Sequence, residues 1–128
     1  MTRDEITLTL PRDRPYFGVA RLVVGGLAAR LDLPYEHLED LQLALESVLA
    51  TDAYAVAGDV TVELAVEDTA VRVGVGPLDR ARLATDLESE EGIALGRLLR
   101  ATVEDVELEQ RDGTAWVRFG KRIPGGAS

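Results

Sequence analysis

The sequence contains no cysteine and only one histidine, His37, among its 128 residues. Without cysteine the chain can form neither disulfide bridges nor thiol-based sites, which fits a cytoplasmic protein. One histidine with no thiolate beside it provides too few ligands for the usual zinc or haem sites. We therefore expect no metal centre of these kinds and a cytoplasmic location.

Long apolar runs and an excess of basic charge are also missing. No run of about 18 apolar residues, the minimum for a membrane-spanning helix, occurs. The charged residues 1–5 lead directly into a strand pattern, so we expect no signal peptide. The formal net charge is −9, which argues against direct binding to nucleic acid. Such an acidic surface either favours a basic protein partner or only keeps the protein soluble, and the sequence leaves both open.

The most regular pattern lies at residues 38–52, where apolar residues recur every three or four positions and predict an amphipathic helix that starts near Pro34. Its apolar stripe consists of Leu38, Leu41, Leu45 and Val48. At about 100° per residue, Ser47 and Thr51 fall on the shoulder of this stripe, whereas Glu46 falls nearly opposite it. The carboxylate in the middle of the helix is therefore expected to point to water.

Elsewhere, alternating apolar and polar residues predict strands, and a helix is expected at 16–31 and another at 92–101. The strands are expected at 6–10, 60–66, 71–75, 103–110 and 114–119. Trp116 is predicted on the polar side of the last strand, where it either marks an interface or is shielded by the chain termini. Gly25 and Gly26 weaken the first helix, so we expect close packing there. Residues 78–91 are charged and poor in apolar side chains, which favours a mobile loop, with at most one helical turn at residues 79–82.

This order of elements predicts an α+β fold. It is a two-layer sandwich, in which a mixed, mostly antiparallel sheet of about five strands carries helices on one face. We expect one domain over residues 1–123 and a flexible tail over residues 124–128.

Several short segments then occur in a telling order: residues 19–21 (VAR) in the first helix, residues 40–45 (DLQLAL) in the second, the valine hairpin, and Gly113-Thr114 leading to Lys121. In this order and spacing the chain resembles the anti-sigma-factor serine kinases of the histidine-kinase-like (GHKL, Bergerat-fold) ATPase superfamily. The resemblance covers most of the chain, and it implies the same helix-backed sheet.

The resemblance also implies a nucleotide site, because members of this superfamily bind Mg-ATP. A glutamate base and an asparagine metal ligand lie on the second helix, and an aspartate after the hairpin receives the adenine amino group. In an alignment without gaps, the base position is Ser47 and the magnesium position is Thr51. The adenine position falls on Gly76 or Pro77, and Asp79 follows about two residues later.

The phosphate-binding Gly-x-Gly of these kinases corresponds to residues 92–94, where Gly92 is kept and Ala94 replaces the second glycine. Thr114 completes this vestigial nucleotide pocket. By the same resemblance Arg21 docks a protein partner; the alternative is that it is one more solvated arginine. No catalytic residue is assigned, and no metal ligand beyond the Thr51 position.

Loss of the adenine contact and the metal ligand, each worth roughly 1.5–3 kcal/mol, would turn a micromolar site into a millimolar one. We therefore expect a regulatory protein that sequesters a sigma factor or an anti-sigma antagonist. Its ATP binding is lost or weak, with no cofactor assigned and ATP/Mg at most a weak ligand. The alternatives are an active ATP-dependent serine kinase that phosphorylates the antagonist, and a structural role as a homodimer or as the partner of an active paralogue.

Overall fold

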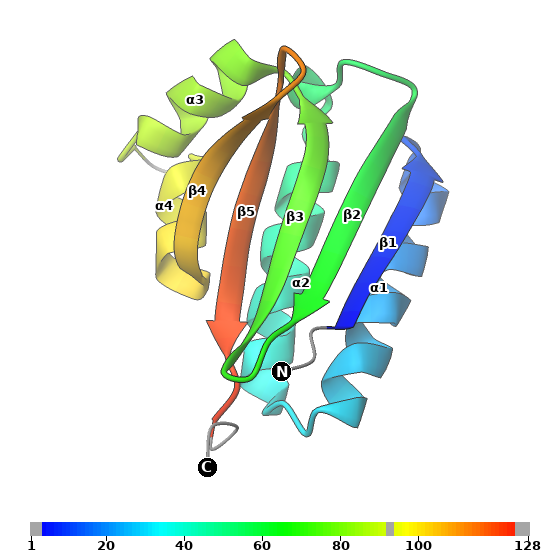
Figure 1. Cartoon of the computed structure of the whole chain (residues 1–128). Helices are drawn as coiled ribbons and strands as arrows, with labels where there is room; N and C mark the ends of the chain where they lie inside the picture. The colour runs from blue at the N-terminus through cyan, green and yellow to red at the C-terminus, as the bar shows by residue number, and fades with distance from the viewer. Residues whose placement is uncertain (1–3, 92–93, 125–128) are drawn as a thin grey trace.

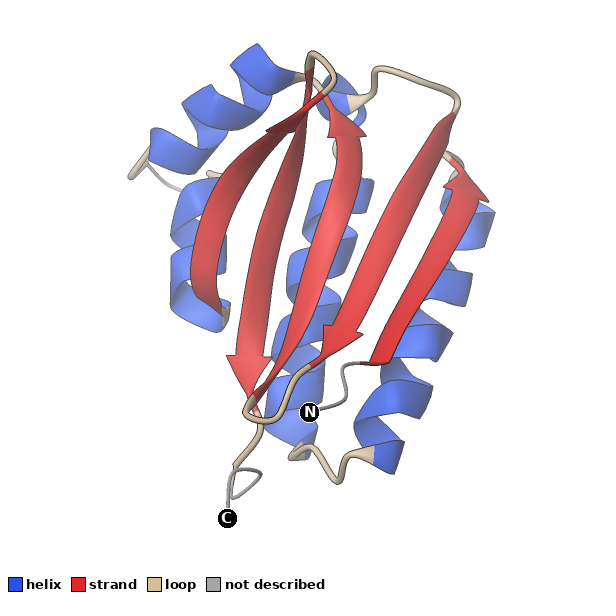
Figure 2. Cartoon of the chain, in the orientation of Figure 1, coloured by secondary structure: helices blue, strands red, loops and turns tan. Residues whose placement is uncertain are grey.

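The computed structural model describes residues 4–91 and 94–124, in which a five-stranded sheet carries helices on one face (Figures 1 and 2). The strands are β1 (Asp4–Pro11), β2 (Asp59–Val66), β3 (Ala70–Leu78), β4 (Glu104–Arg111) and β5 (Thr114–Arg122). The helices are α1 (Arg14–Arg30), α2 (Tyr35–Leu49), the short 3-10 helix η1 (Asp52–Tyr54), α3 (Arg80–Glu88) and α4 (Leu95–Thr102). The predicted α+β fold is confirmed.

The strands follow the order β1-β2-β3-β5-β4, and each neighbouring pair is antiparallel. Two hairpins, β2–β3 and β4–β5, account for two of the pairings. Between the two hairpins the chain runs through α3 and α4 on the helical side of the sheet. In the second hairpin β5 pairs with β3, which leaves β4 at the edge of the sheet. The sheet that the structure describes is thus antiparallel throughout rather than mixed.

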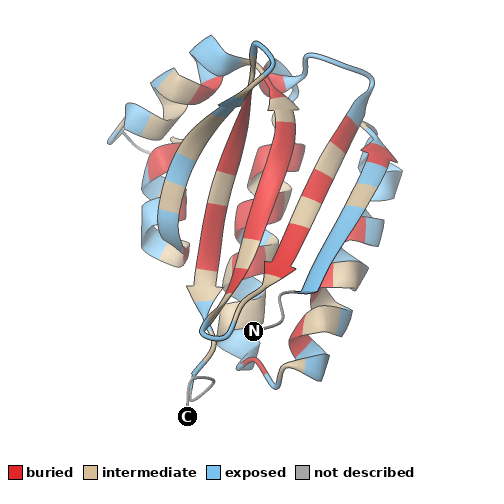
Figure 3. Ribbon diagram, viewed as in Figure 1, coloured by how far each residue is buried: buried red, intermediate tan, exposed pale blue. Residues whose placement is uncertain are grey.

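The core lies between the sheet and the helices, and Figure 3 shows the burial concentrated in the central strands. Three residues of the stripe predicted for α2 are buried, namely Leu41, Leu45 and Val48. The fourth, Leu38, is partly buried and packs against the core. Each fully buried leucine or valine contributes about 1.5–3 kcal/mol relative to an exposed one. The position of α2 against the sheet is therefore fixed by its sequence pattern.

Two boundaries of α2 differ from the prediction. Pro34 is the N-cap rather than a first-turn residue, and the helix ends at Leu49. Thr51 lies beyond the helix in an extended conformation and precedes η1. A guanidinium nitrogen of Arg12 donates to the Thr51 carbonyl at 2.8 Å, which holds the chain at this bend.

The prediction of a mobile loop over residues 78–91 is wrong for the central part of that segment, which forms α3 (Arg80–Glu88). Asp79 begins the helix as its N-cap, because its carboxylate accepts a hydrogen bond from the Arg82 amide at 3.0 Å. Leu83 is completely buried and fastens the helix to the core. One fully buried leucine in a highly charged segment gives only a weak periodic pattern.

A single lysine joins three elements at the other end of the molecule. Lys121 on β5 donates to the Asp40 carboxylate of α2 at 3.0 Å and to the Thr102 carbonyl of α4 at 2.7 Å. These bonds fix α2 and α4 relative to the sheet. No helix in the described part of the chain is long and apolar enough to cross a membrane.

Candidate functional site

A cavity of about 780 Å³ lies where the C-terminal end of α2, η1, α3 and α4 meet. Its apolar lining comes from the α4 region and consists of Ala94, Leu95, Leu98 and Ala101. Its polar lining consists of Ser47, Thr51, Tyr54, Arg82, Asp86 and Arg97. An apolar cavity of this size with a few convergent polar groups is typical of a small-molecule site.

Three residues predicted for the nucleotide pocket line this cavity together: Ser47, Thr51 and Ala94. The Ser47 hydroxyl donates to the Leu43 carbonyl at 2.7 Å, and the Thr51 hydroxyl donates to the Ser47 carbonyl at 2.8 Å. A hydroxyl has one proton, so both groups face the cavity as hydrogen-bond acceptors. A neutral hydroxyl in this arrangement is a poor replacement for a carboxylate base.

Glu46 lies on the other side of α2. Its carboxylate pairs with the Arg21 guanidinium of α1 at 2.8 Å, in a separate groove between the two helices. Both side chains are substantially exposed, at 37% for Glu46 and 54% for Arg21. The expectation that the mid-helix carboxylate points away from the cavity is confirmed, and Ser47 is the residue that α2 contributes to the cavity.

The carboxylate that does line the cavity belongs to Asp86 on α3, a residue that sequence reasoning missed. Its Oδ2 accepts hydrogen bonds from the Tyr54 hydroxyl at 2.6 Å and from Arg82 Nε at 3.4 Å. Burial raises the pKa of Tyr54, and the bond to Asp86 raises it further. Tyr54 therefore stays protonated and holds Asp86 in place.

The signal for Asp86 was present in the sequence. Asp79 is a favourable helix N-cap, and Leu83 and Leu87 follow it with the spacing of four that one helical face requires. A helix started at Asp79 would have carried Asp86 close to this apolar face. The high charge of the segment concealed that pattern.

Other residues predicted for the nucleotide pocket lie elsewhere. Gly76 is on β3 beneath the ring of Trp116, and a Cβ atom there would collide with that ring. Pro77 follows it within the irregularity between Val75 and Leu78, where β3 and β5 shift register. Asp79 caps α3 and lines a different, smaller pocket of about 430 Å³. The structure does not bring these residues together with Ser47.

Two predicted residues are left. The Thr114 hydroxyl donates to the Arg111 carbonyl at 2.9 Å and closes the β4–β5 turn, away from the cavity lining. Gly92 lies outside the described residues. Of the predicted pocket, the cavity thus contains Ser47, Thr51 and Ala94.

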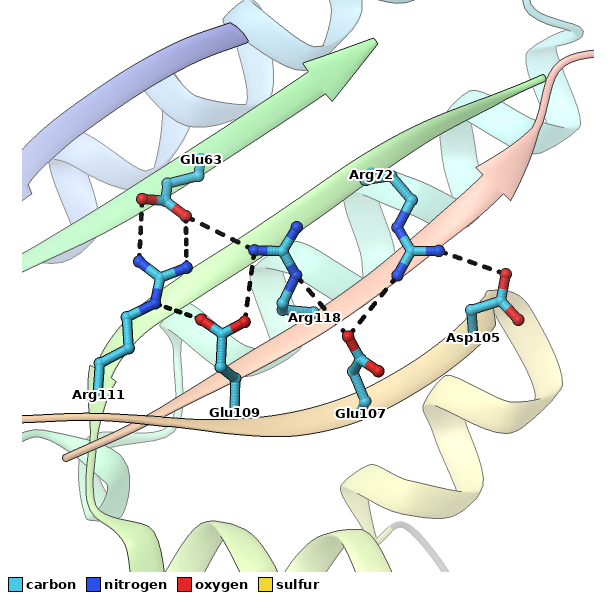
Figure 4. A network of polar contacts seen from close by, with 7 residues as sticks. All are labelled: Glu63, Arg72, Asp105, Glu107, Glu109, Arg111 and Arg118. Carbon is cyan, nitrogen blue, oxygen red and sulfur yellow. Dashed lines mark hydrogen bonds and ion pairs between the residues drawn. The ribbon is translucent and has the colours of Figure 1, made fainter. Parts of the chain in front are cut away.

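The opposite, open face of the sheet carries a dense network of ion pairs (Figure 4). Its members are Glu63, Arg72, Asp105, Glu107, Glu109, Arg111 and Arg118. Arg111 forms two bonds to the Glu63 carboxylate, at 2.9 and 3.1 Å, and another to Glu109. These bonds to Arg111 lower the pKa of Glu63.

Trp116 lies within this face but is only 9% exposed. The Arg111 guanidinium covers its ring at 4.0 Å from the centroid, and Gly76 leaves space for it on the neighbouring strand. Trp116 is therefore shielded, as one of the two interpretations expected, but among the described residues the cover comes from Arg111 rather than from a chain terminus.

The fold and the cavity together define a class. An open antiparallel five-stranded sheet with helices on one face is consistent with the histidine-kinase-like (GHKL) ATPase fold, and the cavity lies between its helices.

Known proteins agree with this class. The chain is similar to the serine-protein kinase RsbW of Halalkalibacterium halodurans, with 28% identity over 140 aligned positions that span 93% of this chain and 85% of that protein. It is also similar to the serine-protein kinases RsbW of Listeria monocytogenes and Listeria innocua, with 37% identity over 65 residues, which are 50% of this chain and 41% of each of those proteins. No family model matches the chain. The resemblance to anti-sigma serine-protein kinases is thereby confirmed, and the chain is RsbW-like over nearly its whole length.

Proposed function

We propose that this chain is an anti-sigma-like regulatory protein that binds a protein partner, either a sigma factor or the antagonist of an anti-sigma factor. In this proposal ATP binding is lost or much weakened. Similarity to the RsbW proteins supports the regulatory role. The observation that carries the loss of ATP chemistry is the pairing of Glu46 with Arg21, away from the cavity.

The chemical argument rests on the two positions that the resemblance assigns to the base and the metal ligand. Phosphoryl transfer depends on a bound metal and a correctly placed proton acceptor. Ser47 and Thr51 supply only hydroxyl oxygens, and the proton of each is already donated to a backbone carbonyl. The metal ligand at Thr51 and the adenine-binding aspartate at Gly76 or Pro77 are both missing, so a Mg-ATP complex loses charge-assisted contacts worth about 3–6 kcal/mol in total, which corresponds to roughly millimolar binding.

For the protein partner we propose the groove between α1 and α2, with Arg21 as a docking residue. Leu43 lines this groove and is 46% exposed, and Leu22, which follows Arg21 in α1, is 77% exposed. Exposed apolar side chains beside an exposed ion pair are suited to an interface, because a partner's charged groups can replace one member of the pair. Apolar contacts then supply affinity and charges supply selectivity. The net charge of −9 favours a basic partner surface.

Calorimetric titration with Mg-ATP tests the loss of nucleotide binding. We expect a dissociation constant weaker than about 100 μM, and a tighter value would contradict the proposal. Purified sigma factors and antagonists from the same organism, titrated against the full chain, test the partner. We expect saturable binding to one of them, and no binding to any would reject the regulatory role.

A second candidate is an active serine kinase that phosphorylates an anti-sigma antagonist, and Asp86 is the observation that favours it. Asp86 places a carboxylate in the same cavity as Ser47 and Thr51. Incubation of the chain with labelled ATP and the antagonist would then yield phosphoserine. Asp86→Asn would abolish the labelling, whereas absence of label in the wild type would rule out this candidate.

We further propose a cytoplasmic location, where sigma factors act, and keep a homodimer as a prediction. Light scattering at two protein concentrations tests the dimer. A mass that stays that of one chain at both concentrations would reject it.

A further inference from the structure

We propose that the outer edge of β4 binds an extended, basic segment of another protein, which adds to the sheet as one more strand. In this segment lysine or arginine alternates with apolar residues. Figure 1 shows β4 at the edge of the sheet, beside α3 and α4. The partner groove proposed above lies between α1 and α2 instead, so this inference does not rest on the proposed function.

The first support is a set of main-chain groups at this edge. The β4–β5 hairpin closes with a two-residue type I′ turn, Asp112-Gly113, so Arg111 forms a hydrogen-bonded pair with the first residue of β5. Pairs in an antiparallel ladder alternate, so Leu108 and Gln110 turn their N–H and C=O groups away from β5. Within the described ranges, no main-chain hydrogen bond from outside the sheet reaches these groups. They are therefore available to an added strand.

The second support is a groove of about 250 Å³ along this edge. Its apolar lining combines two residues of β4, Val106 and Leu108, with two of α3, Ala84 and Leu87. Val106 and Leu108 are only partly buried, whereas Val117, which pairs with Leu108 on β5, is completely buried. A strand that paired with β4 would place every second side chain in this groove and would complete the cover of Val106 and Leu108.

The third support is the charge of the edge, which decides the kind of segment. β4 carries four carboxylates and one cation: Glu104, Asp105, Glu107, Glu109 and Arg111. If two copies of β4 paired, their carboxylates would face one another, so repulsion disfavours a second copy of this chain as the occupant. A basic segment instead brings opposite charges against the same carboxylates.

The acidic side chains along the groove retain capacity for such a cation. Glu107 is 60% exposed, and both of its ion pairs are long, at 4.0 Å each. Glu88 lies on the α3 side of the groove and is exposed. The Arg100 guanidinium also lines the groove, but it pairs with Glu90 at 3.1 Å and donates to two main-chain carbonyls. Its charge is therefore matched within α3, α4 and their connection, and the groove stays acidic.

The regular part of the edge is short. The β4–β5 register shifts between Glu104 and Glu107, and Asp105 has a φ of 53° there. Such an irregularity interrupts the ladder, so the edge that an added strand can follow spans residues 107–111. At about 3.3 Å per residue, a peptide of about seven residues covers this span.

The test is a titration of the full chain with the peptide acetyl-Lys-Val-Lys-Val-Lys-Val-Lys-amide, followed by calorimetry and by hydrogen exchange of main-chain amides. We expect a dissociation constant of about 100 μM or tighter, and slower exchange at the amides of Leu108 and Gln110. Valine side chains enter the groove, so the valine N–H groups are the ones that donate to β4.

Two control peptides separate the contributions of charge and of main-chain pairing. One has the same residues in two blocks, four lysines followed by three valines, and the other is N-methylated at each valine. The first keeps the charge without the alternation, and the second keeps both but loses the donors. Each should bind at least about tenfold more weakly than the alternating peptide.

Two pairs of variants test the protein side. Gln110→Pro removes one outward N–H group and should weaken binding about tenfold, whereas Gln110→Ala keeps that group and should leave binding unchanged. Glu107→Gln should weaken binding about threefold. Its control, Glu36→Gln, removes the same charge from an exposed site in the first turn of α2 and should have no effect. Thermal unfolding followed by circular dichroism checks that all four variants are folded.

Three results overturn the inference. The first is no binding of the alternating peptide at about 1 mM, and the second is equally tight binding of the block peptide, which would show attraction by charge alone. The third is protection confined to amides outside β4. Binding of a sigma factor or antagonist at the α1–α2 groove is measured separately, so failure of that proposal and failure of this one are distinguishable.

Discussion

The two faces of the sheet use polar residues in different ways. On the open face, Arg111 is bonded to Glu63 and Glu109 and also covers Trp116, so its charge is matched by neighbours on the same surface. On the helical face, Arg82 and Arg97 extend into a cavity with donor capacity to spare. Because saturated ion pairs offer little to a ligand, this comparison supports the candidate site on the helical face rather than a ligand site on the open face.

The largest effect is expected from closing the space between α3 and α4 beside the cavity. A Cβ atom on Gly96 would collide with the Leu87 carbonyl, which is also held by Arg100 at 2.8 Å. Gly96→Ala must therefore displace α3 and should lower the free energy of unfolding by about 2–3 kcal/mol. Urea unfolding followed by circular dichroism measures the change.

The matched control is Gly26→Ala in α1, where an added Cβ atom meets no other atom within 4 Å. Alanine there should raise the free energy of unfolding by about 0.5–1 kcal/mol, because glycine is a poor helix former. Equal effects of the two substitutions would show that α3 and α4 are not in close contact.

The next effect concerns the open face alone. Arg111→Ala removes two bonds to Glu63 and uncovers Trp116, and we expect a loss of about 1–2 kcal/mol in unfolding free energy. Arg111→Met keeps an apolar cover on the ring and should recover part of that loss. Neither substitution should alter ligand or partner binding, and a tenfold change in either would contradict the separation of the two faces.

Acidification should act on the same network. Arg111 lowers the pKa of Glu63 below its ordinary value of 4.5. As the pH falls, Glu63 is therefore protonated in the unfolded chain before it is protonated in the folded chain. Its full contribution to stability is present above pH 4.5, and this contribution is lost as the pH falls through the lowered pKa of the folded state. Urea unfolding between pH 7 and about pH 3 should show a shallower acid limb in Arg111→Met; an identical limb in both proteins would exclude Glu63 as the cause.

The smallest stability effect is expected at the α1–α2 groove. A double-mutant cycle of Arg21→Ala and Glu46→Ala should give a coupling of about 0.2–1 kcal/mol, as is usual for an exposed ion pair. Partner affinity should respond far more strongly to Arg21→Ala. A partner that binds Arg21→Ala as well as the wild type would place its docking surface elsewhere.

The parts of the structure that were predictable from sequence depend on local periodicity. The strands and the stripe of α2 follow from alternation and from a spacing of three and four, and the orientation of Glu46 follows from the same helical angles. The apolar repeat of α3 is too short to stand out, so Asp86 was missed. Its importance also depends on Tyr54, which reaches it from a different element.

Contacts between distant residues were not predictable. Trp116 is shielded by Arg111 across the hairpin, an arrangement that no pattern within one strand reveals. Close packing was expected at both glycines of α1. An added Cβ at Gly25 would meet Gln42 at 3.7 Å, an ordinary contact, and Gly26 meets nothing, so the expectation was wrong.

The most direct test of the central claim is a titration of Mg-ATP into the wild type and into a double variant, Ser47→Glu with Thr51→Asn, which restores the carboxylate and the amide that the resemblance requires. The account predicts wild-type binding weaker than about 100 μM and at least about tenfold tighter binding by the double variant. Wild-type binding tighter than about 100 μM, with no gain in the double variant, would contradict it.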